Sequence, residues 1–423
     1  MLDIRFIREN VDAVRTALAN RRAEVDLDGL LALDQERRNG LQEVERLKQE
    51  RNTASKEIGQ RKKAGEDTEA VQAQVRALGQ QISDLDQRIR TIDQELTQRL
   101  LTIPNLPSSH TPIGADDADN VLVRTEGEAP SFDFDPTTHV ELAERLGLVD
   151  FARGTKLSGA GFVVYTGVGA KLERALIQFM LDMHTREHGY TEISPPFMCN
   201  TETMTGTGQL PKMAEDMYTV PADSLYLIPT AEVPVTNLYR DEIIDGELPI
   251  GFVAYTPCFR REAGAAGRDT RGLIRIHQFD KVELVRFVEP ENSYNELELL
   301  LGHAETILQR LGLHYRIREL CTGDLSFAAA RCYDIELWAP GQQDWLEVSS
   351  CSNFEDFQAR RARIRHRPEG GKPRLVHTLN GSGVALARLF VAILENYQEA
   401  DGSVAIPEAL IPYMGGLERI TPS

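Results

Sequence analysis

The segment from Val71 to Leu96 constrains the fold of this chain more than any other, because its apolar residues are spaced alternately four and three positions apart. The repeat consists of Val71, Val75, Leu78, Ile82, Leu85, Ile89, Ile92 and Leu96. An unbroken heptad repeat of this kind predicts a long helix with one apolar seam, which must pack against another helix to be shielded from water.

A partner for this helix lies just before it in the sequence. A similar but less regular repeat, interrupted at Arg37, Gly40 and Arg51, is formed by Leu33, Val44, Leu47, Ala54 and Ile58. A polar break containing Gly65 separates the two segments. We therefore expect residues 27–101 to form an antiparallel hairpin of two helices, about 50 Å long at about 1.5 Å per residue. A coiled coil that joins two chains is the alternative left open by the pattern.

The composition changes after the hairpin. Residues 103–120 are rich in Pro, Ser, Thr, Gly and Asp, and they predict a linker between an N-terminal domain, residues 1–102, and a second domain, residues 121–423. Short connections between successive strands of the second domain indicate an antiparallel sheet flanked by helices, so the predicted fold class is α+β. The predicted helices cover 171–188, 294–311 and 383–397, and the predicted strands cover 225–228, 252–261, 273–287, 332–338 and 345–349.

The charge of the chain limits its partners. A net charge of −18 argues against a protein that coats nucleic acid indiscriminately. Residues 27–102 hold 13 basic and 14 acidic side chains, so an RNA contact would fall most naturally on this nearly neutral segment. Because the chain has no run of about 18 apolar residues and no signal sequence, we expect a cytoplasmic protein with no membrane partner.

Cysteine and histidine spacing gives no indication of a zinc site. The five cysteines form no Cys-x-x-Cys pair and are expected to be reduced thiols: Cys199, Cys258, Cys321, Cys332 and Cys351. His184 and His188 are four positions apart on a predicted helix, but the zinc-protease pattern requires Glu directly after the first histidine, and Glu187 precedes the second. We expect both to be surface polar residues and expect no zinc.

Three separated clusters suit the chemistry of a nucleotide. The strand ending at Arg260 turns through small residues with flanking arginines, which predicts a flexible loop for anions. With regular alternation, the returning strand has one face formed by Arg275, His277, Phe279, Lys281 and Glu283. The alternative is a solvated hairpin with a salt-bridged outer face.

The other two clusters lie nearer the C-terminus. In the strand at 345–353, Glu347 precedes a run of hydroxyl side chains, and alternation places Ser349 on its face. Carboxylate and hydroxyl oxygens are ligands that magnesium accepts. Gly381 and Gly383 precede a helix containing Arg388, where a ligand could approach the backbone. No Walker loop and no Rossmann glycine pattern occurs, so an ATP site must be built differently.

Combined, these residues resemble the class II aminoacyl-tRNA synthetases, most closely the bacterial seryl enzymes. The hairpin 252–287 resembles motif 2, residues 380–388 resemble motif 3, and residues 193–196 stand in the motif 1 position; further similar stretches are 205–212, 229–232 and 349–361. The resemblance covers essentially the whole chain. It implies a homodimer that activates L-serine with ATP to form seryl-adenylate and pyrophosphate. It also implies that serine is then transferred to the 3′ end of tRNA(Ser) and of tRNA(Sec).

The resemblance further implies roles for individual residues. The implied catalytic residues are Arg260, Glu347 and Arg388. ATP would be bound by Arg260, Arg261, Glu262, Arg275, Ile276, Phe279, Glu347, Val348, Ser349, Ser350 and Arg388. Serine would be bound by Thr230, Ala231, Glu232, Arg260, Glu283, Asn380 and Ser382. The implied cofactor is Mg²⁺, held by Glu347 and Ser350, although free alternation would favour Ser349 over Ser350.

The helical hairpin resembles the arm with which these enzymes hold the tRNA. Basic residues that could contact the RNA are Arg38, Arg46, Lys56, Lys62, Lys63 and Arg76. Three competing interpretations remain. The first is a class II synthetase for a different amino acid. An ATP-dependent ligase of the same fold that charges a carrier protein is expected to lack the long arm. A coiled-coil interaction protein that binds nucleotide without reaction has no need of the charged set Arg260, Glu262, Glu283, Glu347 and Arg388.

Overall fold

The computed structural model describes residues 1–263 and 272–422. The chain divides into two compact units, one formed by residues 1–19 and 23–104 and the other by residues 20–22 and those from 105 onward. Residues 105–120, expected as linker, are therefore grouped with the second unit. In that unit the Asn105 side chain donates hydrogen bonds of 2.9 Å to the carbonyl oxygens of Ala328 and Phe354. The predicted anion-binding turn at 264–271 lies outside the described residues.

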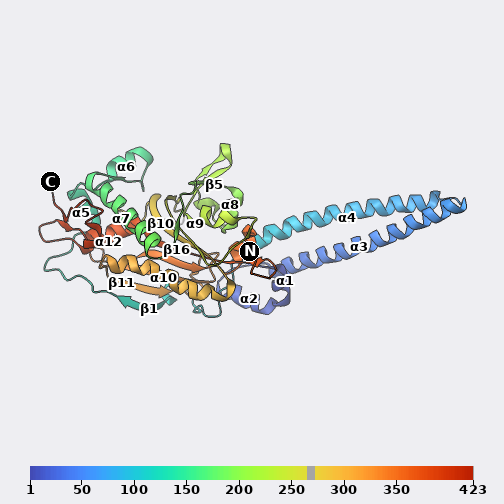
Figure 1. The fold of residues 1–423 in the computed structure, drawn as a ribbon, viewed down its shortest axis with the longest axis horizontal. Helices are drawn as coiled ribbons and strands as arrows, with labels where there is room; N and C mark the ends of the chain where they lie inside the picture. The colour runs from blue at the N-terminus through green and yellow to red at the C-terminus, as the bar shows by residue number, and fades with distance from the viewer. Residues whose placement is uncertain (264–271, 423) are drawn as a thin grey trace. The chain divides into compact units, whose positions relative to one another are not determined.

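The first unit is dominated by the helical hairpin (Figure 1). After the short helices α1 (Ile4–Glu9) and α2 (Val11–Asn20), α3 (Leu27–Ala64) and α4 (Glu69–Leu101) pack along one another. Gly65 ends α3 with a φ of 75°, which glycine adopts without strain, and its N–H bonds to the carbonyls of Arg61 and Lys62. The seam is formed by Val44, Leu47, Leu78, Ile82, Leu85 and Ile89. The predicted hairpin is confirmed.

The irregular half of the repeat has a physical explanation. Near the start of α3, one of the buried positions is occupied by Asp34 and not by an apolar residue. Its carboxylate accepts hydrogen bonds from Arg8 at 2.9 Å and from Arg38 at 3.1 Å. Gly40 lies against α4, since a Cβ atom there would be 3.1 Å from Cγ1 of Ile89. Gly40 thus allows the two helices to approach, although in the sequence it interrupts the repeat.

The second unit is built on a sheet that has eight strands in the part of the chain that the structure describes. Every neighbouring pair is antiparallel except β4 with β9, which confirms the predicted α+β class. The order is β1 (Val121–Glu126), β11 (Tyr315–Glu319), β12 (Arg331–Ala339), β13 (Asp344–Asn353), β16 (His377–Ala385), β10 (Gln278–Val288), β9 (Ile250–Phe259) and β4 (Thr191–Glu192).

The two faces of this sheet are covered differently. One face packs against the long helices α7 (Gly167–Arg186), α10 (Ser293–Arg310) and α12 (Leu386–Asn396), and Val282 and Leu284 of β10 belong to this core. On the other face, α9 (Glu232–Thr236) and α11 (Phe357–Ala362) contribute to a smaller core with Val285 and Phe287. Because side chains alternate along a strand, Lys281 and Glu283 of β10 face away from the long helices, whereas Arg286 faces them and pairs with Glu296 of α10.

Smaller elements complete this unit. The short helices are α5 (His139–Arg145), α6 (Phe151–Ser158) and α8 (Thr201–Gly206). The small sheets are formed by β2 (Val149–Asp150) with β3 (Val164–Tyr165), by β5 (Met198–Asn200), β7 (Leu225–Leu227) and β6 (Thr219–Val220), by β15 (Arg374–Leu375), β14 (Arg365–His366) and β8 (Ile243–Ile244), and by β17 (Val404–Ala405) with β18 (Arg419–Ile420). No helix within residues 1–263 and 272–422 is long and apolar enough to cross a membrane.

Two sequence predictions about this unit were wrong. The helix predicted over 383–397 begins only at Leu386, and the residues before it form the central strand β16, whose glycines allow helices to approach. A Cβ atom on Gly381 would lie 2.3 Å from Cδ2 of Leu300 in α10, and one on Gly383 would lie 2.8 Å from Nε2 of His184 in α7. His184 is consequently buried, not a surface residue. Its Nδ1 lies 3.0 Å from Nδ1 of His188.

Candidate functional site

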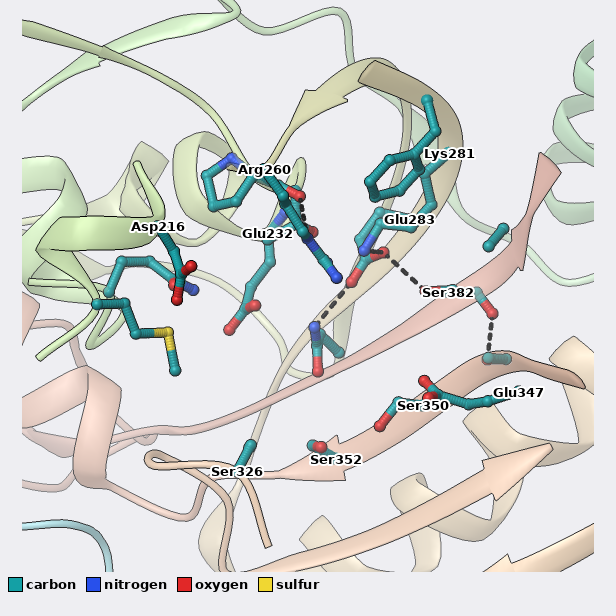
Figure 2. Close-up of a pocket in the computed structure, with 18 of the residues that line it drawn as sticks. Asp216, Glu232, Arg260, Lys281, Glu283, Ser326, Glu347, Ser350, Ser352 and Ser382 are labelled. Atoms are coloured by element: carbon teal, nitrogen blue, oxygen red, sulfur yellow. Dashed lines mark hydrogen bonds and ion pairs between the residues drawn. The ribbon is translucent and has the colours of Figure 1, made fainter. Parts of the chain in front are cut away.

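A cavity of about 640 Å³ lies on the sheet face that carries Glu283 and Ser382 (Figure 2). Its walls come from β10, β13 and β16, from the first turn of α12 and from the segments that flank β9 and α9. Of the residues expected to bind ATP, serine or metal, those that line it are Thr230, Glu232, Arg260, Glu262, Arg275, Ile276, Phe279, Glu283, Glu347, Val348, Ser349, Ser350, Asn380, Ser382 and Arg388. The structure therefore gathers residues more than 150 positions apart in the sequence into one site.

Two of the expected site residues do not line this cavity. Ala231 is fully buried, because it lies at the start of α9 and belongs to the smaller core that also contains Val285 and Phe287. Arg261 is exposed and donates to the carbonyl of Glu215 at 3.1 Å, so its charge lies outside the cavity wall. Direct binding of ATP or serine by these two side chains is not supported.

Arg260 lies at the centre of the charged wall. It follows directly after β9, and its N–H bonds to the carbonyl of His277 at 2.9 Å, which continues the hairpin beyond the strand. Its guanidinium lies 5.2 Å from the ring centre of Phe279 on β10, and Nε donates to the carbonyl of Pro229 at 3.3 Å. A cation and an aromatic face are thus presented together to the cavity.

The other motif 2 residues are arranged around this pair. Glu262 adopts the left-handed conformation with a φ of 51°, a strained state for a non-glycine residue, and forms an ion pair with Arg275. Strand alternation was predicted to include His277, but β10 begins only at Gln278. His277 instead places Nδ1 3.0 Å from the carbonyl of Arg260 and does not line the cavity.

Arg388 closes the opposite wall from the first turn of α12. Its Nε donates to the carbonyl of Ile274 at 3.2 Å, and its NH1 donates to the carbonyl of Glu347 and lies 3.7 Å from the Glu347 carboxylate. The guanidinium of Arg388 therefore links the segment that leads into β10 to strand β13.

A β-bulge in β13 decides which hydroxyl faces the cavity with Glu347. Opposite β12, Ile335 pairs with Ser349 but Glu336 pairs with Glu347, so Val348 is an extra residue and the alternation shifts by one. Val348 and Cys351 lie in the core, whereas Ser350 lines the cavity near Glu347 (Figure 2). Ser349 is buried and donates to the carbonyl of Ser382 at 2.6 Å.

The oxygen groups at this end of the cavity suit a hard cation. Glu347 keeps a half-exposed carboxylate, and the Ser350 hydroxyl lies beside it. Burial and the nearby charge of Glu347 raise the pKa of the Asp334 carboxyl on the neighbouring strand well above its ordinary value. Among the described residues, no group of three or more His, Cys, Asp or Glu side chains is arranged to hold a metal by itself. A metal here would need further oxygen ligands from substrate or water.

A narrow polar pocket lies at the closed end of the cavity. The Glu283 side chain is only 1% exposed, and its Oε1 accepts from Asn380 Nδ2 at 2.7 Å. Its Oε2 accepts from Ser382 Oγ at 3.3 Å and lies 2.7 Å from Nζ of Lys281. Asn380 and Ser382 lie on the neighbouring strand β16, two residues apart and on the same face.

Glu232 provides a second buried carboxyl at the same end. Its Oε1 accepts from Nε2 of Gln358 at 2.6 Å. Burial, and then the charge of Glu283, raise the pKa of Glu232 from about 4.5 to about 7, against the opposing effects of Gln358, Lys281 and Arg260. This carboxyl therefore changes charge close to neutral pH.

Several residues that line the cavity were not assigned a site role from the sequence. Lys281 was placed on the correct strand face but given no role, although its alternation with Phe279 and Glu283 was a usable signal. Asp216 and the loop residues Ser326, Phe327 and Ala328 also line the cavity, and they have no local pattern by which to recognise them. Thr207, Gly208 and Gln209 belong to a stretch quoted for the resemblance.

The basic residues expected to contact RNA all lie on the helical hairpin. Lys56, Lys62, Lys63 and Arg76 are exposed. Arg46 forms ion pairs with Glu43 and Glu50, and Arg38 pairs with Asp34. An anion that binds either arginine would have to compete with these carboxylates.

Comparisons with known proteins agree with this geometry. Residues 1–107 match the model of the seryl-tRNA synthetase N-terminal domain, and residues 218–397 match that of the tRNA synthetase class II core domain (G, H, P, S and T). The chain is 60% identical over 421 residues to a serine–tRNA ligase of Pelotomaculum thermopropionicum, covering 99% of this chain and 100% of that protein. It is 59% identical to the serine–tRNA ligase of Alkaliphilus oremlandii, over the full length of both.

Solved structures show the same likeness. The seryl-tRNA synthetase of Pyrococcus horikoshii, crystallised with ATP, superimposes over 100% of both chains with a TM-score of 0.95 and 40% identity. The cytoplasmic serine–tRNA ligase of Naegleria fowleri in complex with AMP covers 100% of this chain and 99% of its own, with a TM-score of 0.91 and 29% identity.

Proposed function

This chain belongs to the seryl-tRNA synthetase family and is a class II serine–tRNA ligase, and on that premise we propose how its cavity performs the two steps of the reaction. ATP and L-serine bind side by side. The serine carboxylate attacks the α-phosphorus in line, the bond to the pyrophosphate oxygen breaks, and seryl-adenylate forms. A hydroxyl at the 3′ end of the tRNA then takes the seryl group, and AMP leaves.

The observation that best supports this proposal is the adjacency of two pockets in one cavity. The polar pocket around Glu283 has room and hydrogen-bonding groups for a small hydroxyl side chain, and the wall formed by Arg260 and Phe279 presents a cation and an aromatic face. Arg260 lines the same cavity as Glu232 and Glu283 (Figure 2). There it can neutralise the serine carboxylate and the α-phosphate together, which holds two anions in reacting geometry.

The nucleotide is assigned to the wall formed by motif 2 and Arg388. Phe279 stacks on the adenine, and Arg388 covers its other face and reaches the γ-phosphate. Glu262 accepts from the adenine amino group, and Arg275 supports the triphosphate, with the backbone at Ile276 close to the nucleotide. Val348 and Ser349 contribute backbone and packing at the same wall, since both side chains are buried.

Glu347 and Ser350 are the residues that would hold Mg²⁺. Their oxygen atoms suit a hard cation, and the bulge at Val348 brings them to one face of β13. When bound, the ion neutralises charge on the phosphates. The Glu347 carboxylate also forms an ion pair with Arg388 near the same place, with 3.7 Å between Oε2 and NH1.

Serine is assigned to the closed end of the cavity. Thr230 and Glu232 bind its ammonium group, and Glu283 with Asn380 and Ser382 binds its hydroxyl. Alanine would leave these buried groups without a partner, and such sites reject the analogue that lacks the hydroxyl.

The helical hairpin is proposed as the tRNA arm, and the six basic side chains named above are proposed to contact phosphates of the RNA. Recognition of an RNA helix depends mainly on shape and backbone, which fits an arm of nearly balanced charge. Because such recognition requires no particular base sequence, we include tRNA(Sec) with tRNA(Ser) as a substrate. We also propose a homodimer acting in the cytoplasm, in which the arm of one subunit serves the cavity of the other.

ATP–pyrophosphate exchange on the purified protein, with each of the twenty amino acids and no tRNA, tests the proposal. Exchange with serine alone is expected. Exchange with another amino acid, or none with serine, would overturn the assignment of the pocket. Serylation of tRNA(Ser) and tRNA(Sec) transcripts, with sedimentation to determine the number of subunits, tests the finer claims separately.

A further inference from the structure

Lys281 is a buried cation that the proposed reaction has not yet used. Its side chain is 7% exposed, lines the cavity from β10, and places Nζ 2.7 Å from Oε2 of Glu283 (Figure 2). A buried lysine is costly unless it is paired, so the fold retains this charge at an energetic cost.

The charges at the closed end of the cavity explain why a cation is needed there. Glu232 and Glu283 are two carboxyls in one buried pocket, and the charge of Glu283 raises the pKa of Glu232. In the proposed complex, the serine ammonium neutralises Glu232 and the serine carboxylate neutralises Arg260. The serine hydroxyl has no charge, so the substrate brings nothing to balance Glu283.

We propose that Lys281 is a positioning residue for serine: by its ion pair with Glu283 it balances the charge of that carboxylate, so that Glu232 can carry its own charge and bind the ammonium group while Glu283 accepts from the hydroxyl. This inference rests on the proposed serine site. It adds a residue that contacts no substrate and acts through Glu283 and Glu232.

The groups around Glu232 support this role. The pKa of Glu232 is already raised to about 7 by burial and by the charge of Glu283, and it is lowered by Gln358, Lys281 and Arg260. The Cys258 thiol on β9 is buried, its pKa is raised by that burial, and it stays neutral in this range. Of the two cations, Arg260 is committed to the reacting carboxylate and phosphate. Loss of Lys281 therefore raises the pKa of Glu232 further, above neutral pH.

Kinetics as a function of pH separate this role from a merely structural one. Pyrophosphate exchange is measured against serine concentration from about pH 6 to about pH 8.5 for the native protein, Lys281→Met, Lys281→Arg and the exposed control Lys372→Met. We expect Lys281→Met to raise KM for serine about tenfold at pH 7 and far less at pH 8.5, with KM for ATP and kcat little changed. Lys281→Arg should retain most of the native affinity, and Lys372→Met should behave as native.

The outcomes are distinguishable. A rise in KM for serine by one constant factor at every pH, or an equal rise in KM for ATP, would overturn the inference. Absence of serine-dependent exchange in the native protein would instead overturn the proposed function itself. If Lys281→Met alone does not fold, Lys281→Met with Glu283→Gln removes both charges. In this double variant, the pH below which KM for serine rises should return to the native value. If KM for serine in the double variant still begins to rise at a higher pH than in the native protein, the inference is refuted.

Discussion

Replacing Glu232 by glutamine is expected to stabilise the unliganded protein while abolishing its use of serine. Glu232 is buried, and burial together with the charge of Glu283 raises its pKa from about 4.5 to about 7. Between these two values the folded protein keeps a proton that the unfolded chain has lost. The free energy of unfolding therefore falls as the pH rises from about 4.5 to about 7, and it stays lower above that range.

The size of the effect follows from the two pKa values. The raised pKa of Glu232 lowers the free energy of unfolding by about 3 kcal/mol at pH 8, where the carboxyl is ionised in the folded protein. At pH 5.5, where most of the folded protein keeps the proton, it lowers that free energy by only about 1 kcal/mol. Glutamine has nearly the same shape, and its carbonyl oxygen can still accept from Gln358 Nε2, which lies 2.6 Å from Glu232 Oε1. The variant should thus gain about 2 kcal/mol more at pH 8 than at pH 5.5, a rise of a few degrees in Tm.

Thermal melts of the native protein and Glu232→Gln at both pH values, without ligand, measure this difference. Pyrophosphate exchange on the same samples should show loss of serine activation in the variant. Glu128→Gln is a matched control, because this side chain is exposed and its replacement should change Tm little at either pH. A variant that is destabilised equally at both pH values would refute the reasoning, since it would show that Glu232 is not ionised at a cost in the folded protein.

Three further predictions follow from the fold. Replacing residues 34–99 by a short linker should leave exchange with serine intact, because all residues lining the cavity lie between 207 and 388, and should abolish serylation of tRNA; retained serylation would contradict the arm assignment. Arg260→Ala should lower the exchange rate by about a hundredfold or more, and a rate within a few-fold of native would exclude the proposed contact. Burial lowers the pKa of His184 to about 3. The protein should therefore lose about 1.4 kcal/mol of stability per pH unit from this histidine as the pH falls below about 6.5, whereas a Tm that is constant from pH 7 to 5 would contradict this.

Local patterns predicted those elements whose formation depends on near neighbours. The heptad seam from Val71 to Leu96 specifies a long helix, and the repeat before it specifies a partner, because both signals arise within a few turns of one helix. The hairpin was therefore predictable in extent, and only its irregular turns at Asp34 and Gly40 needed the packed structure to explain them.

The candidate site was predictable in its residues but less so in its geometry. Charged and aromatic side chains grouped around motif 2 and Arg388 identified the cavity wall, and most of them line it. Arg261 has the same chemistry as Arg260 and is adjacent in sequence, yet it bonds to Glu215 outside the cavity. No local property distinguishes the two arginines, because their direction is set by the turn that follows β9.

The sequence by itself determined the long helical arm, the α+β class and the kinds of chemical group available to bind ATP and serine. Only the tertiary structure decided which of these groups meet. The extra residue Val348 brings Ser350 to the face of Glu347, the glycines of β16 allow α7 and α10 to approach a central strand, and the register of β10 with β16 brings Asn380 and Ser382 to Glu283. Each of these outcomes depends on pairing between strands distant in the sequence, and a shift of one residue in such a pairing moves a side chain from one face of the sheet to the other.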